Sequence, residues 1–163
     1  MKAKLFVLAA LTFAASAARA SDQALTLAIP SVVPSMRATA RISVPAGTKS
    51  TPADGGQGVV LKAGPGFSMS LATGRNMMLG KSAADMVTGG GFLKDAHVEV
   101  STDSLLIYNY KNDDGKQTYD FVVQVSGASV PFECRNVSSG GLTFTRANVD
   151  AMVKACKTTT QVK

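Results

Sequence analysis

The only two cysteines of the chain, Cys134 and Cys156, stand about 22 residues apart near its C-terminal end. In an oxidising compartment two such cysteines are expected to form one intramolecular disulfide. A loop of this length stabilises a fold by roughly 3 kcal/mol in the chain-entropy model. We therefore predict a disulfide that joins the run at residues 130–134, which has the pattern of a strand, to a C-terminal helix.

The N-terminal segment has the pattern of an export signal. Two lysines precede an apolar run at residues 5–15, and Ala-Arg-Ala at residues 18–20 forms a small-x-small cleavage site. We predict that residues 1–20 are a signal peptide, cleaved between Ala20 and Ser21, and that the protein is periplasmic or secreted. The apolar run is too short to span a bilayer, which takes about 20 residues, so we expect no permanent membrane anchor.

The remaining residues, 21–163, suit a single globular domain. Three of the 17 Lys and Arg residues lie in the predicted signal, which leaves 14 basic against 11 acidic side chains. This excess is small and is not gathered into a basic block, so we do not expect nucleic acid as a partner.

Alternating and β-branched runs predict most of the domain as strands. Residues 104–110 and 117–125 flank a turn that contains Asp-Gly, which indicates a long hairpin. A further strand before it would complete a three-stranded meander. That strand is expected at residues 96–101, and other strands are expected at residues 37–44, 57–62, 67–71 and 130–134.

Two helices are predicted. The first begins at a capping pattern near Ser82 and stops by the glycines at 89–91; the second follows Thr145 as N-cap, with apolar residues at spacings of three and four up to Cys156. We expect residues 49–58 to be an exposed loop and residues 157–163 to be frayed.

These elements predict an α+β domain with a mainly antiparallel sheet, a short central helix and a C-terminal helix held by the disulfide. A β-sandwich with helical decorations is the alternative.

The sequence lacks most catalytic signatures. It contains one histidine, His97, and no nucleotide-binding loop or zinc-binding spacing of cysteines and histidines. Asp95, His97 and Glu99 alternate along a predicted strand and would share one face, so they are weak candidates for a metal site or an acid/base cluster. The alternative is a polar outer face of a strand, which we favour, and we expect no metal and no cofactor.

Four methionines, Met69, Met77, Met78 and Met86, occur within 18 positions. Thioethers bind Cu(I), but methionines more often fill core gaps or adaptable contact surfaces. We favour core packing for this group.

We therefore expect a small non-enzymatic binding module, with a protein of the cell envelope as partner. An inhibitor or immunity protein against a cell-wall hydrolase or toxin would have this form. The alternatives are a small envelope enzyme that uses Asp95, His97 and Glu99, or a structural or assembly subunit of the envelope. Because loops on a rigid scaffold commonly bind partners, the candidate contact residues are those of two predicted loops: Arg75, Asn76, Asp113 and Asp114.

Overall fold

The computed structural model describes residues 21–74, 79, 85, 87–89, 93–137 and 142–163. The predicted signal peptide, at residues 1–20, therefore lies outside the described residues. So does most of the predicted central helix, of which residues 85 and 87–89 are described and are helical.

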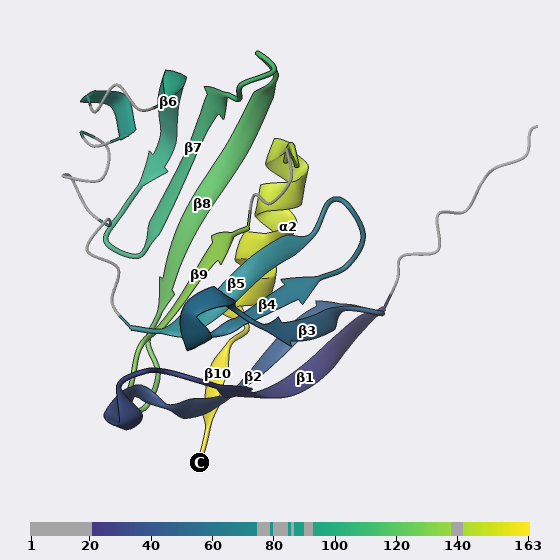
Figure 1. Ribbon diagram of the computed structural model, residues 1–163, viewed down its shortest axis with the longest axis vertical. Coiled ribbons are helices and arrows are strands. Elements are labelled where there is room, and N and C mark those ends of the chain that lie inside the picture. The colour runs from purple at the N-terminus through teal and green to yellow at the C-terminus, as the bar shows by residue number, and fades with distance from the viewer. Residues whose placement is uncertain (1–20, 75–78, 80–84, 86, 90–92, 138–141) are drawn as a thin grey trace, which may run out of the picture.

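The larger of two antiparallel sheets has seven strands in the order β3-β4-β5-β9-β8-β7-β6 (Figure 1). Every neighbouring pair in it is antiparallel, and consecutive strands are neighbours except where β9 enters between β5 and β8. The strands are β3 (Lys49–Pro52), β4 (Val59–Lys62), β5 (Ser68–Thr73), β6 (Lys94–Ser101), β7 (Leu105–Lys111), β8 (Gln117–Val125) and β9 (Phe132–Asn136).

The predicted hairpin and meander are confirmed as β6, β7 and β8. At the turn between β7 and β8, Asn112 accepts a hydrogen bond from the Lys116 backbone N–H at 2.9 Å through its side chain, and Gly115 has a φ of 74°. Glycine takes this left-handed conformation without the steric penalty of a Cβ, which is why Asp-Gly marks the turn.

The smaller sheet contains β1 (Asp22–Ile29), β2 (Ala38–Pro45) and β10 (Thr160–Val162), in the order β1-β2-β10. Strand β1 was not predicted from the sequence. The prediction of a frayed C-terminal tail is wrong, because residues 160–162 pair with β2, with Gln161 opposite Ala40. Short 3-10 helices lie at Pro34–Met36 and Asp54–Gly56.

The prediction of an exposed loop at residues 49–58 is wrong in part. Residues 49–52 form β3 and pair with β4, although all four side chains are exposed. The ladder with β4 pairs the backbone groups on one side of β3, even though its side chains add nothing to the core.

The C-terminal helix, α2 (Arg146–Lys157), begins where the sequence predicted. Thr145 accepts a hydrogen bond from the backbone N–H of Asn148, and the Asn148 side chain accepts one from the backbone N–H of Thr145. This reciprocal capping box satisfies two of the backbone N–H groups that a helix start leaves unpaired. The apolar face of α2 packs against the sheet through Val149, Met152 and Val153.

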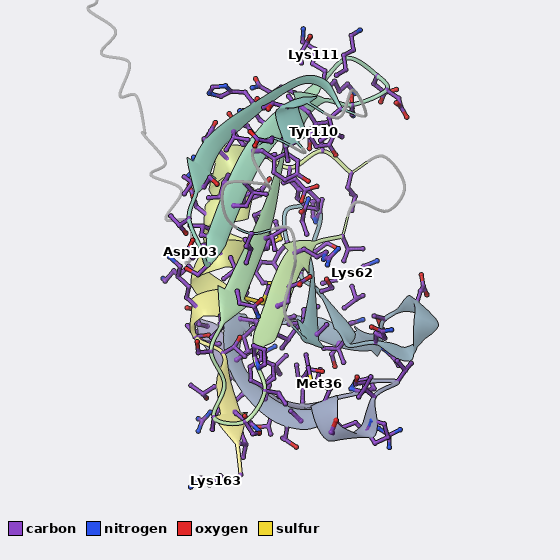
Figure 2. The ribbon with its side chains drawn as sticks, turned by 90° about the vertical axis from the view of Figure 1, so that its left-hand side faces the viewer. Met36, Lys62, Asp103, Tyr110, Lys111 and Lys163 are labelled. Carbon is purple, nitrogen blue, oxygen red and sulfur yellow. A yellow bond between two sulfur atoms is a disulfide. The ribbon has the colours of Figure 1, made fainter. Side chains whose placement is uncertain are left out.

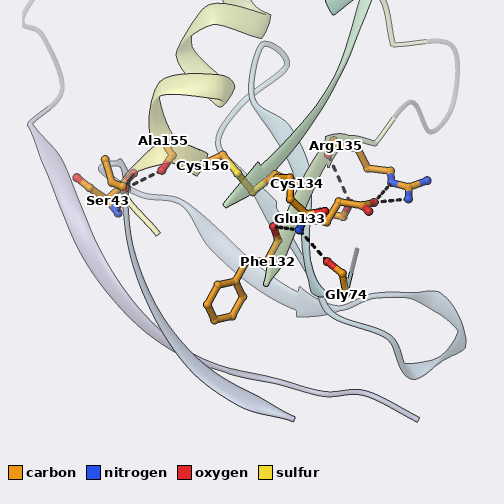
Figure 3. The surroundings of a disulfide bond; sticks show 11 residues. Ser43, Gly74, Phe132, Glu133, Cys134, Arg135, Ala155 and Cys156 are labelled. Carbon is orange, nitrogen blue, oxygen red and sulfur yellow. Dashed lines mark hydrogen bonds and ion pairs between the residues drawn. A yellow bond between two sulfur atoms is a disulfide. The ribbon is translucent and has the colours of Figure 1, made fainter. Parts of the chain in front are cut away.

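The predicted disulfide between Cys134 of β9 and Cys156 of α2 is present, and both cysteines are fully buried (Figure 3). It ties the last turn of the helix to the middle of the seven-stranded sheet. The surrounding core combines both sheets and the helix, and its largest fully buried side chains include Phe121, Phe132 and Phe144. Met69 lies in this core, as predicted; Met77, Met78 and Met86 lie outside the described residues.

Candidate functional site

The seven-stranded sheet has two different faces. On β8, Phe121 and Val123 belong to the main core under α2, whereas Val122 belongs to a second apolar cluster on the opposite face. Alternation along a strand sends successive side chains to opposite faces, so Asp120 shares the face of Val122. The second cluster also contains Leu106 and Val87. Asp120 and this second apolar cluster therefore lie on the same face of the sheet.

A polar row crosses this face over three neighbouring strands. Tyr108 of β7 lies directly opposite Asp120 of β8, and Arg135 of β9 lies opposite Val122, one position further along the same face. Arg135 forms an ion pair with Glu133 of its own strand. Figure 3 shows Glu133 and Arg135 on the side of β9 away from Cys134 and the disulfide. The disulfide thus holds β9 from one face while the polar row occupies the other.

Asp120 is the most perturbed carboxyl group of this row. Burial raises its pKa to about 6, although hydrogen bonds from the Phe121 backbone N–H and the Tyr108 hydroxyl and the charge of Arg135 act in the opposite direction. The bond from Phe121 N to Asp120 Oδ1 measures 2.8 Å. Burial and the neighbouring Asp120 raise the pKa of Tyr108, so its hydroxyl stays protonated and donates to the carboxylate.

A hollow lies beside the polar row, between the start of β6 and the turn that joins β7 to β8. We call it the hairpin-tip hollow; its volume is about 600 Å³. Its lining includes Lys94, Tyr110, Lys111, Asp113 and Asp114. Figure 2 shows Tyr110 and Lys111 at the end of the molecule opposite Lys163.

Tyr110 connects the hollow to the polar row. Its ring stacks on that of Tyr108, with ring centroids 6.1 Å apart and an angle of 28° between the planes. Because Tyr108 is itself fixed by Asp120, its ring supports the neighbouring ring of Tyr110. Burial raises the pKa of Tyr110, and the neighbouring carboxylates Asp120 and Asp113 add to the effect.

The hollow therefore offers a supported aromatic ring flanked by both signs of charge. Its volume is within the range of sites that hold a small ligand or a side chain of a partner. Tyrosine and arginine are enriched among the residues that contribute most to protein–protein binding. This arrangement suits the binding of an apolar or aromatic group with polar neighbours.

The predicted contact residues divide into two groups. Asp113 and Asp114 line the hairpin-tip hollow, whereas Arg75 and Asn76 lie outside the described residues. Sequence reasoning missed Tyr108, Tyr110 and Arg135 as site residues. The available signal was Asp120, the one charged residue of β8.

Asp95, His97 and Glu99 lie on the edge strand β6. All three side chains are exposed and alternate with the half-buried Ala96 and Val98. Irregularities in the pairing of β6 occur on both sides of His97, and Asp95 has a φ of 52°. Lys111 pairs with Asp95 at 2.7 Å and lowers its pKa, whereas Glu99 pairs with Arg146 and accepts a hydrogen bond from Asn109. Within the described part of the chain, no group of three or more His, Cys, Asp or Glu side chains is arranged to hold a metal ion.

A second depression, of about 930 Å³, lies at the end of the smaller sheet near Ile29 and Val162. It is larger, but among the described residues that line it only Arg37 and Lys163 have ionisable side chains. We favour the hairpin-tip hollow as the functional site because it combines aromatic and charged groups, and because Tyr108 and Asp120 hold its aromatic ring in place.

Comparison with protein-family models, curated proteins and solved structures finds no match to this chain. Among the described residues, no helix has the length and apolar character needed to cross a membrane.

Proposed function

We propose that this chain is an exported, non-enzymatic binding module of the cell envelope that contacts a partner protein through the hairpin-tip hollow. The role that fits best is an inhibitor or immunity protein that blocks a cell-wall hydrolase or toxin. Export is supported by the signal pattern at residues 1–20, and periplasmic or secreted proteins commonly carry disulfides such as Cys134–Cys156.

The observation that carries this proposal is the stacking of Tyr108 against Tyr110. A ring that is already held in place loses little conformational freedom on binding, and this lowers the cost of association. Tyr108 stacks against it and is anchored by Asp120, so the aromatic contact is organised before any partner arrives.

The charges around the hollow supply specificity. Asp113 and Asp114 lie in the turn, and Lys94 and Lys111 lie on the flanking strands. Complementary charges guide partners together and reject those with the wrong pattern. A partner loop that carries an apolar or aromatic side chain with charged neighbours would match these groups.

We also assign the domain to the α+β class. Helix α2 covers one face of the seven-stranded sheet with a continuous apolar stripe and is joined to it by a disulfide. It shares the core with the smaller sheet, whereas in a β-sandwich with helical decorations the second sheet would bury that face and the helix would lie outside the core.

Affinity capture with single-residue variants tests the proposed contact site. The tagged protein is incubated with its native envelope extract, and retained proteins are quantified for wild type, Tyr110→Ala and Asp103→Ala. We expect Tyr110→Ala to reduce the retained partner at least about tenfold, on the scale of about 1.4 kcal/mol or more for a binding hot spot.

Asp103 is a matched control because it is exposed and lies in the turn at the opposite end of β7. Its variant should retain the partner like the wild type. Equal retention by Tyr110→Ala and wild type would remove the hairpin-tip hollow as the contact site. A protein that retains no partner even after crosslinking would contradict the binding function itself.

A further inference from the structure

The two sheets present four edges among the described residues, and three of them are protected against pairing with another chain. Strand β6 has irregular pairing and begins with Lys94 and Asp95. Strand β3 has four residues, including Lys49 and Pro52, and β10 has three. Charged residues, proline, bulges and short length are the usual devices that prevent edge pairing.

Strand β1 has fewer of these devices, since its one charged residue, Asp22, stands at its first position. It contains eight residues, pairs with β2 in a regular register along its whole length, and carries no lysine, arginine or proline. Within the described chain its ladder runs to β2 alone, so its other edge presents unpaired backbone groups. Such an edge is a template for another strand.

The inward face of β1 is incompletely covered. Leu25 and Leu27 are only partly buried, whereas Ile42 and Ala40, their partners across the ladder on β2, are fully buried. The outward residues Ala24, Thr26 and Ala28 are exposed and small or uncharged. An added strand would cover the two leucines without burying a charge.

We propose that β1 pairs with β1 of a second copy of this chain, in an antiparallel arrangement centred on Thr26. The two three-stranded sheets would then form one continuous six-stranded sheet. A two-fold interface requires a self-complementary surface. Strand β1 provides one because its large apolar side chains all lie on the inward face and its exposed side chains on the outward face.

The register follows from the two faces of the strand. Residues directly opposite each other in an antiparallel pair share a face, so a centre at Thr26 places Leu25 opposite Leu27 of the second copy, on the inward side. On the outward side, Thr26 lies opposite Thr26 and Ala24 opposite Ala28. Asp22 falls opposite Pro30, so no like charges meet. A centre at Leu25 would instead place Gln23 opposite Leu27.

This interface is small. One pair of eight-residue strands buries less than the roughly 1,600 Å² of a standard interface. We therefore expect a weak dimer whose population rises with protein concentration. The pairing does not depend on the hairpin-tip hollow, because β1 and the tip of β7 and β8 lie at opposite ends of the molecule (Figure 1).

Sedimentation velocity over a concentration series tests the pairing. Wild type should shift from monomer to dimer as its concentration rises, and it should form no larger oligomer. Thr26→Lys places two lysines opposite each other and should weaken association by up to about fivefold, the scale of a like-charge cross-strand pair. Thr26→Glu should do the same.

An equimolar mixture of the Thr26→Lys and Thr26→Glu variants should restore the dimer, because opposite charges then face each other. Thr51→Lys is the matched control: Thr51 is an exposed threonine on the protected edge strand β3, and its variant should associate like the wild type. A wild type that stays monomeric, a Thr26→Lys variant that dimerises normally, or a mixture that stays monomeric would overturn the proposal.

Discussion

Tyr108 donates its hydroxyl hydrogen to the carboxylate of Asp120, across the pair that the two residues form between β7 and β8. The bond holds the ring of Tyr108 in place beside that of Tyr110, on which it stacks. Burial of the Asp120 carboxyl group disfavours its ionised form, and the bond from Tyr108 offsets only part of this effect. The support of the candidate site therefore has an electrostatic cost.

Replacing Asp120 with Asn should change how stability depends on pH. The pKa of Asp120 is about 6 in the folded protein and about 3.9 in an unfolded chain. Between these values the folded state binds more protons, so the free energy of unfolding falls as pH rises. In wild type this contribution lowers the free energy of unfolding by roughly 3 kcal/mol above pH 6, and Asp120→Asn should abolish the loss.

Urea unfolding at a series of pH values between about 4 and 8 measures this difference. The variant should be more stable than wild type at the upper end, and the advantage should vanish at the lower end. Asp103→Asn, at an exposed position, should leave the pH profile unchanged. Parallel profiles for Asp120→Asn and wild type would show that Asp120 titrates normally.

The sequence predicted elements with strong local periodicity and missed those defined by distant pairing. The β7–β8 hairpin and α2 have clear repeats, a turn signal and an N-cap within a few residues of one another. Strand β10 consists of Thr160, Gln161 and Val162, and its partner β2 lies about 120 residues earlier in the chain. No local pattern marks such a strand.

For the same reason, the sequence predicted only part of the candidate site. Asp113 and Asp114 could be proposed because they lie in a recognisable turn. Tyr108 lies opposite Asp120 within the predicted hairpin. Arg135 joins them because β9 enters the sheet beside β8, and this order follows from the packing of the whole core. Hydrophobic periodicity assigns faces to a strand but does not identify its neighbours.

Removing the disulfide should destabilise the fold without changing its topology. The double variant Cys134→Ser and Cys156→Ser should lose about 3 kcal/mol of unfolding free energy, because the unfolded chain regains the freedom of a 22-residue loop. Equilibrium urea unfolding measures the loss. A reductant should destabilise wild type to a similar extent and leave the variant unaffected; a variant as stable as oxidised wild type would contradict this role.

Gly58 should tolerate a side chain far less well than Gly47. Both have a positive φ, of 88° and 78°, but a Cβ at Gly58 would lie 2.5 Å from the carbonyl oxygen of Leu71, whereas nothing lies within 4 Å at Gly47. We expect Gly47→Ala to cost about 1 kcal/mol for its backbone conformation and Gly58→Ala about 3 kcal/mol for the added clash. Similar thermal unfolding of the two variants would argue against the close approach of β5 at Gly58.

The side chain of Gln161 should stabilise the C-terminal strand. Its Oε1 accepts a hydrogen bond from the backbone N–H of Ser129 at 2.8 Å, and this fastens β10 to the loop before β9. Gln161→Ala should cost about 1 kcal/mol of unfolding free energy. Thr160→Ala, at an exposed position on the same strand, should cost much less; equal effects of the two variants would indicate that the bond contributes nothing.

The most direct test of a partner at the hairpin-tip hollow is site-specific photo-crosslinking in native envelope extract. A benzophenone amino acid is placed at position 114, which lines the hollow, or at position 103, at the other end of β7. We predict one dominant crosslinked partner from position 114 and none from position 103. Equal adducts from both positions, or none from position 114, would contradict the proposed site.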